Sequence, residues 1–140
     1  MRLPSRLPLV ALMAGSGIYH LVAPEFYERI VPRPLGHARF WVYASGVAEL
    51  LGATLLAAPR TRRAGGWMCA VLLMVVFPAN VQMALDGGAR GATGIVGSPV
   101  AAWLRLPLQV PLVWWAAREG RRRDDDGDRP TARPSPASLS

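Results

Sequence analysis

The sequence predicts an all-α membrane protein, folded as an up-and-down bundle of four transmembrane helices. Three observations predict this fold. Hydrophobic residues make up 51% of the 140 residues and charged residues only 18%. Four apolar stretches are long enough to cross a bilayer. The charged residues collect in the two ends of the chain and in the breaks between these stretches, where topology signals of membrane proteins lie. At this length the chain forms one domain.

The first predicted helix covers residues 7–23, which carry no charged side chain apart from His20. A basic start followed by an apolar segment also fits a cleaved signal peptide. However, Pro24 follows the segment directly, and His20 lies where a cleavage site requires small neutral residues. We therefore expect a retained helix, followed by a connection over residues 24–39.

The second predicted helix, residues 40–58, contains a single charge, Glu49, near its middle. At ~1.5 Å per residue this helix spans ~28 Å, the thickness of a hydrocarbon core. A bare carboxylate at that depth costs at least ~2.5 kcal/mol, so Glu49 needs a partner or a proton. Small residues one turn away allow close helix packing. Glu49 should therefore face other helices.

The third predicted helix covers residues 66–85 and contains Pro78, which frees the carbonyl group of Met74. A glycine-rich loop, residues 86–98, leads to the fourth predicted helix at residues 100–117. Prolines inside both helices are tolerated in membranes where neighbouring groups satisfy the backbone. Residues 118–140 are polar and are predicted to form a disordered cytoplasmic tail.

The net charge of +7 comes entirely from arginine, with no lysine. On one side of a four-span protein we count nine arginines, and on the other side four. The excess predicts that both termini are cytoplasmic. No basic face with interleaved aromatic residues is present, so nucleic-acid binding is not expected. The nine arginines are Arg2, Arg6, Arg60, Arg62, Arg63, Arg118, Arg121, Arg122 and Arg123.

Each predicted helix contributes a polar side chain to the outer half of the membrane. Helical rise places His20 about 6 Å below the outer boundary, Asn80 and Arg105 roughly 9 Å, and Glu49 about 15 Å. In the simplest arrangement Glu49 pairs with Arg105, because a guanidinium fork suits a carboxylate. The candidate buried polar site consists of His20, Glu49, Asn80, Arg105 and Gln109.

Two interpretations of this cluster stay open. It either locks the four helices in register or forms a pocket that binds a ligand or handles protons. No metal is expected, because His20 and Glu49 provide too few ligands. A haem with axial histidines is disfavoured because His37 lies in a connection. The single cysteine, Cys69, excludes an intramolecular disulfide and a CxxC pair. No catalytic residue is assigned.

Several motifs resemble the DoxX family of small bacterial membrane proteins, specifically its DoxX-like branch. In chain order they are AGSGIYH, VPRPLG, ASGVAELLGA, PRTRRAG, VFPANVQMAL and WLRLPLQVPLVWW, between residues 14 and 115. The resemblance implies a four-helix bundle in the bacterial inner membrane, with the five polar residues at recurrent family positions. It also links the chain to thiol and oxidative-stress systems, and to a thiosulfate:quinone oxidoreductase.

Three functions follow from these considerations. The first is an accessory or anchoring subunit of a membrane-associated redox or stress-response complex, which is not an enzyme on its own. The second is a quinone-binding component of a thiol or thiosulfate:quinone oxidoreductase. The third is a small-solute carrier. The expected partners are the lipid bilayer and a soluble or membrane redox protein. No resident cofactor is expected, while a bound quinone and a homo-oligomer are left open.

Overall fold

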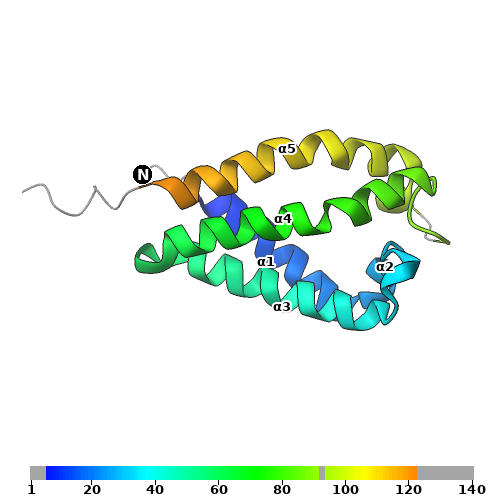
Figure 1. Ribbon diagram of the computed structural model, residues 1–140, viewed down its shortest axis with the longest axis horizontal. Coiled ribbons are helices and arrows are strands. Elements are labelled where there is room, and N and C mark those ends of the chain that lie inside the picture. Colours follow the sequence, from blue (N-terminus) through cyan, green and yellow to red (C-terminus); the bar gives the residue numbers. More distant parts are fainter. Residues whose placement is uncertain (1–5, 92–93, 123–140) are drawn as a thin grey trace, which may run out of the picture.

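The computed structural model describes residues 6–91 and 94–122, and every regular element in this part of the chain is a helix. Four long helices run alternately in opposite directions (Figure 1). Three 3-10 turns and one short helix connect them. The elements are α1 (Leu7–Val22), α2 (Pro24–Glu28), η1 (Arg33–Leu35), α3 (Ala38–Ala57), η2 (Pro59–Thr61), α4 (Arg62–Leu85), η3 (Ile95–Gly97) and α5 (Pro99–Arg121).

The observed boundaries differ most from the predicted ones at two places. α4 begins at Arg62, four residues before the predicted start, and α5 ends at Arg121, four residues after the predicted end. The two extensions lie beside each other, because the Arg62 side chain pairs with Glu119. Residues 118–121 are therefore helical rather than part of a polar tail. The remainder of the predicted tail, residues 123–140, lies outside the described residues.

By length and composition, two helices of the described chain could cross a membrane: residues 38–57 and 59–85. α1 is apolar but has only 16 residues. α5 is not among the helices that meet this criterion. The all-helical prediction is thus confirmed for the described residues, and a membrane location is suggested by two of the four long helices.

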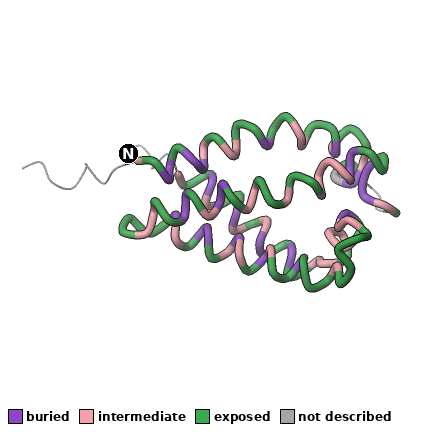
Figure 2. The backbone as a smooth tube through the Cα atoms, in the orientation of Figure 1, coloured by how far each residue is buried: buried purple, intermediate pink, exposed green. Residues whose placement is uncertain are grey.

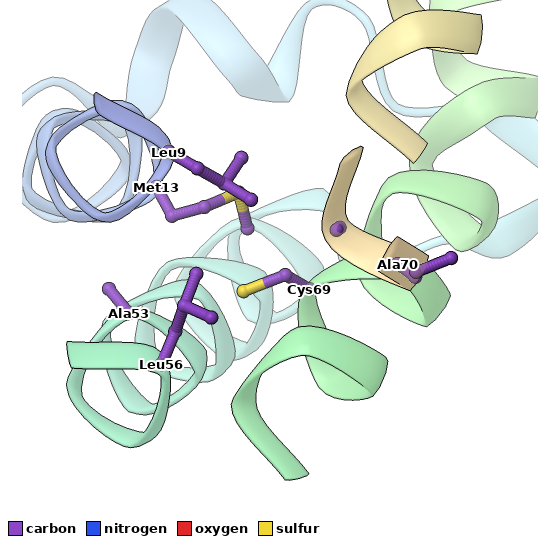
Figure 3. Packing of buried hydrophobic residues seen from close by; sticks show 8 residues of the cluster. Leu9, Met13, Ala53, Leu56, Cys69 and Ala70 are labelled. Atoms are coloured by element: carbon purple, nitrogen blue, oxygen red, sulfur yellow. The ribbon is translucent and has the colours of Figure 1, made fainter. Parts of the chain in front are cut away.

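One end of the bundle, which we call the closed end, holds a packed apolar core. α1 contributes Leu9 and Met13, α3 contributes Leu56, and α4 contributes Cys69, all less than 4% exposed. Figure 3 shows these side chains gathered between the three helices. Ala116 and Ala117 add α5 to the same cluster. All four long helices therefore meet at this end.

Glycines set the close approach of the helices. A Cβ atom built on Gly46 in α3 would lie 2.8 Å from His20 Cβ in α1, and one on Gly66 in α4 would collide with the backbone of Gly120 in α5. At Gly65 the colliding backbone belongs to Leu55 and Leu56 of α3. Any side chain at these positions would push two helices apart.

At the other end, which we call the open end, the pair α1–α3 diverges from the pair α4–α5 (Figure 1). Figure 2 shows exposed positions along much of the outer side of α5. α2 and the residues after it lie across this end, where Ile30 packs with Met83 and Ala102. The two connections at this end are also joined by polar contacts: Arg90 Nε donates to the carbonyl of Arg29 at 2.9 Å. α2 thus covers the open end of the bundle.

Candidate functional site

A cavity of about 670 Å³ lies at the open end, between the two helix pairs. Its lining comes from α1 to α5 and from the connection after α2. Most of the lining is apolar, and four of the five predicted polar residues are part of it: His20, Glu49, Asn80 and Arg105. A cavity of this size accommodates a typical small-molecule ligand.

Glu49 projects from the middle of α3 with only 9% of its side chain exposed. Its Oε2 atom lies 3.4 Å from Nδ1 of His20, a contact between opposite charges only when the imidazole is protonated. The Ser16 hydroxyl group also contacts the carboxylate. Within residues 6–91 and 94–122, however, the fully covered Oε2 atom accepts no hydrogen bond. The carboxylate is buried with one oxygen unsatisfied.

His20 is held by its own helix and by α2. Its Nδ1 atom donates to the carbonyl oxygen of Ser16 at 2.8 Å. The Tyr27 ring stacks on the imidazole, with ring centroids 3.5 Å apart and planes 18° apart. Burial raises the pKa of the Tyr27 phenol, so this group stays neutral and can act as a hydrogen-bond donor. His20 is therefore fixed in orientation, and its Nδ1 proton points at the helix backbone rather than at Glu49.

Asn80 and Gln109 form a separate pair between α4 and α5. Asn80 Nδ2 donates to Gln109 Oε1 at 2.8 Å, and Gln109 Nε2 donates to the carbonyl of Leu73. That carbonyl precedes Met74, whose oxygen is the one expected to lose its partner at Pro78. Gln109 thus bonds to the carbonyl next to the one that Pro78 frees, and the pair joins α4 to α5.

Arg105 lines the cavity from α5 but contacts α4 and α2. Its Nη1 atom lies 3.2 Å from the sulfur of Met83. The guanidinium carbon lies 5.9 Å from the centroid of the Phe26 ring, within range of a cation–π contact.

The side chain next to the Glu49 carboxylate differs from the expected one. His20, and not Arg105, lies beside it. α1 and α3 pass close to each other at Gly46, and this brings His20 of α1 next to the carboxylate of Glu49 in α3.

The sequence interpretation missed an ion pair at the closed end. Arg62 Nε donates to Glu119 Oε2 at 2.8 Å, and the Glu119 side chain is only 1% exposed. Arg122 approaches the other carboxylate oxygen at 3.8 Å. The sequence interpretation places both Arg62 and Glu119 in polar segments outside the predicted helices. The signal available in the sequence was Glu119 itself, an acid among arginines directly after an apolar helix.

No group of three histidine, cysteine, aspartate or glutamate side chains that could hold a metal ion occurs in the part of the chain that the structure describes. Cys69, the single cysteine, lies in the closed-end core, away from the cavity lining. The chemistry available in the cavity is therefore hydrogen bonding and charge, from a carboxylate, an imidazole, a phenol, an amide and a guanidinium group.

Residues 2–119 match the family described as Domain of unknown function (DUF8561). The chain is a member of this family. No curated protein and no solved structure matches the chain. The assignment of this DUF8561 protein to the DoxX family, made from short motifs, is therefore wrong.

The error has a physical reason. Motifs such as ASGVAELLGA combine small residues with one polar residue at helical spacing. Close helix crossings around a buried polar group favour this pattern in any bundle. Gly46 and Gly52 of this motif contact neighbouring helices at such crossings. In the DUF8561 chain packing geometry is enough to explain the motifs, and the functions implied by the DoxX resemblance lose this support.

Proposed function

We propose that the chain is a four-span protein of the bacterial inner membrane that binds an amphipathic small molecule in the open-end cavity. The observation that carries this proposal is the cavity itself. It is mainly apolar, yet His20, Glu49 and Arg105 add polar groups to its lining. Apolar pockets with a few convergent polar groups are the usual form of ligand sites.

The distribution of side chains on α5 supports four spans rather than two. The polar side chains Arg105, Gln109 and Glu119 are half-buried or buried in the bundle. The outward positions are large and apolar, as lipid contact requires. At ~1.5 Å per residue, α5 is long enough to cross a bilayer, and α1 nearly so. The exposed apolar residues of α5 are Val100, Trp103, Leu104, Leu108, Val110 and Trp114.

Labelling with a membrane-impermeant maleimide tests the topology. Leu35 and Arg60 are both exposed and lie in connections at opposite ends of the bundle. With cytoplasmic termini, intact cells should be labelled in the Leu35→Cys variant and not in the Arg60→Cys variant. The unsubstituted chain, whose Cys69 is buried, is the control. Equal labelling of both variants in intact cells would contradict the four-span arrangement.

A cavity-filling substitution tests the binding function. Ala79 lines the cavity on α4, so Ala79→Phe should reduce the amount of co-purifying small molecule by about tenfold, since the added ring occupies ligand space. Ala44→Phe on the exposed face of α3 is the matched control. Mass spectrometry of extracts from the purified proteins measures both. Identical extracts from the two variants would contradict ligand binding in this cavity.

The predicted role as an accessory or anchoring subunit is compatible with this function, because a bound ligand can be presented to a partner protein. Quinone binding is a more specific form of the same proposal, since a quinone combines a polar ring with an apolar tail. A carrier function is less favoured: α2 covers the open end, and the core that includes Leu9 and Leu56 fills the closed end.

A further inference from the structure

We propose that an anionic phospholipid binds in a groove between α4 and α5 at the closed end, with one acyl chain in the groove and its phosphate group at Arg121. The groove, which we call the closed-end groove, has a volume of about 420 Å³. This inference uses the membrane location proposed above. It goes beyond the open-end cavity, because it concerns another site and another ligand.

The closed-end groove exists because short side chains face each other across two closely packed helices. Figure 1 shows α4 and α5 running side by side to the closed end, where Gly66 meets the backbone of Gly120. About one turn further along each helix, Ala70 and Ala117 line the groove and are only 5% and 8% exposed. Their methyl groups leave a hollow that larger side chains would fill.

The wall of the groove on α4 is apolar and open to the surroundings. Val71, Met74 and Val75 line it and are all more than half exposed. The helical rise from Trp67 to Val75 is ~12 Å, which is long enough for part of an acyl chain. A chain that lies in the hollow gains dispersion contacts along this length. The shape therefore suits a lipid tail.

The closed end of the groove carries a guanidinium group on an aromatic ring. A Cβ atom built on Gly120 would lie 2.8 Å from Trp67 Cδ1, so the Trp67 ring lies directly against α5. The guanidinium carbon of Arg121 lies over this ring, 5.5 Å from its centroid. Stacking occupies one face of a guanidinium plane and leaves the N–H groups at its edge, which bind phosphate through paired hydrogen bonds.

Two more arginines lie around this end of the groove. Arg118 precedes Arg121 by three residues on α5, and its guanidinium carbon lies 5.5 Å from the centroid of the Trp114 ring. Arg63 precedes Trp67 by one turn on α4. Residues at these spacings share a helix face, and both arginines are exposed. Tryptophan and arginine together are typical of the headgroup level of a membrane.

The charge at this end selects the occupant. Among residues 6–91 and 94–122, the acidic side chain at the closed end is Glu119, which is buried against Arg62. A second copy of the chain packed on the same face would bring the arginines of both copies together, and like charges repel. Basic pockets between membrane helices bind anionic lipid headgroups. An anionic phospholipid therefore fits both the groove and its charged end.

A choice between two lipids with identical chains tests the inference. The full chain in detergent micelles is given equal amounts of dioleoyl phosphatidylglycerol and dioleoyl phosphatidylcholine, and bound lipids are counted by native mass spectrometry. Phosphatidylglycerol should bind about tenfold more tightly, because the choline group is repelled by the arginines. The aspartates at positions 124–126 and 128, outside the described residues, are present to compete. Equal binding, or displacement by inorganic phosphate in large excess, would overturn the inference.

Two arginine variants separate a site from general attraction to the basic end. Arg121→Gln should reduce the preference for phosphatidylglycerol to about twofold. Arg60→Gln is the matched control, because it removes the same charge from an exposed position at the same end, outside the groove lining. The control should keep the full preference. Equal losses in the two variants would show a diffuse effect of charge and contradict a site at Arg121.

Two valine variants test the place of the acyl chain. Val71 lines the groove and is 57% exposed, whereas Val47 on α3 lies outside its lining and is 58% exposed. Val71→Phe should lower the binding of both lipids several-fold, since the ring occupies chain space, and Val47→Phe should not. Unchanged binding in Val71→Phe would contradict a chain in the groove. Dimers without lipid that are lost in Val71→Phe would assign the groove to a second copy and overturn the inference.

The filled open-end cavity separates this inference from the proposed function. Ala79 lines that cavity and not the closed-end groove, so Ala79→Phe should leave phosphatidylglycerol binding unchanged. Loss of the lipid in this variant would place it in the open-end cavity, which overturns the inference while the binding function stands. If Ala79→Phe changes no co-purifying molecule and Arg121→Gln still removes the lipid preference, the binding function fails and the inference stands.

Discussion

The two ends of the bundle treat buried polar groups in opposite ways. At the closed end Glu119 receives hydrogen bonds from Arg62, beside the packed apolar core. At the open end Glu49 keeps an unsatisfied oxygen beside a cavity of about 670 Å³. The first arrangement stabilises the fold. The second leaves a polar atom buried at a cost to the folded state, which is not expected of a carboxylate that only stabilises the fold.

Of the substitutions that test this difference between the two ends, replacement of Arg62 should change the unfolding free energy most. The Arg62→Met variant should lose about 3–5 kcal/mol of unfolding free energy, because it leaves Glu119 buried without its main partner. Denaturation in mild detergent, followed by circular dichroism, measures the loss. The double variant Arg62→Met with Glu119→Leu should recover most of it. A single variant as stable as the unsubstituted chain would show that the pair is not structural.

A substitution at the closed-end crossing of α4 and α5 should give the next largest loss of unfolding free energy. Gly66→Ala should cost about 1–3 kcal/mol, because the new methyl group collides with the backbone of Gly120. Gly15→Ala is the matched control: no atom lies within 4 Å of the added Cβ, and alanine favours helices. The free energies of unfolding of both variants measure the difference. Similar values for the two would argue against a close crossing at Gly66.

The smallest effect on stability should come from the open end. Glu49→Gln should change the unfolding free energy by no more than about 1 kcal/mol, because the carboxylate that it replaces is not fully satisfied. The same denaturation measurement as for Arg62→Met allows direct comparison. A loss as large as that of Arg62→Met would place Glu49 among the structural residues and remove the contrast between the ends.

The sequence predicted four long helices and the polar positions, because both depend on local pattern. Helix boundaries were displaced by four residues where Arg62 and Glu119 pair across 57 positions of the chain, which no local pattern contains. The partner of Glu49 was also mistaken. Depth along a helix axis was used to match it with Arg105, whereas the direction around the axis and the Gly46 crossing bring His20 to it.

The cavity itself could not be predicted from the residues. It exists because two helix pairs diverge, and divergence depends on where the small residues of different helices meet. Motif resemblance was misleading for the same reason, since small-residue spacing is shared by unrelated bundles. What the residues did show was which polar groups lie deep in the helices, and four of those five line the cavity.

The connection after α2, which lies across the open end, affects the units in which the affinity of a ligand for the cavity should be given. A hydrogen bond between Arg90 and the Arg29 carbonyl joins the two connections at the open end, and Ile30 packs beside them. If the four helices cross a membrane as proposed, these contacts restrict one end of the bundle and the apolar core fills the other, so a ligand of the proposed kind enters from among the acyl chains. Its occupancy then follows its mole fraction in the lipid, so dissociation constants measured per litre of buffer will vary with the amount of membrane, while constants measured per lipid will not.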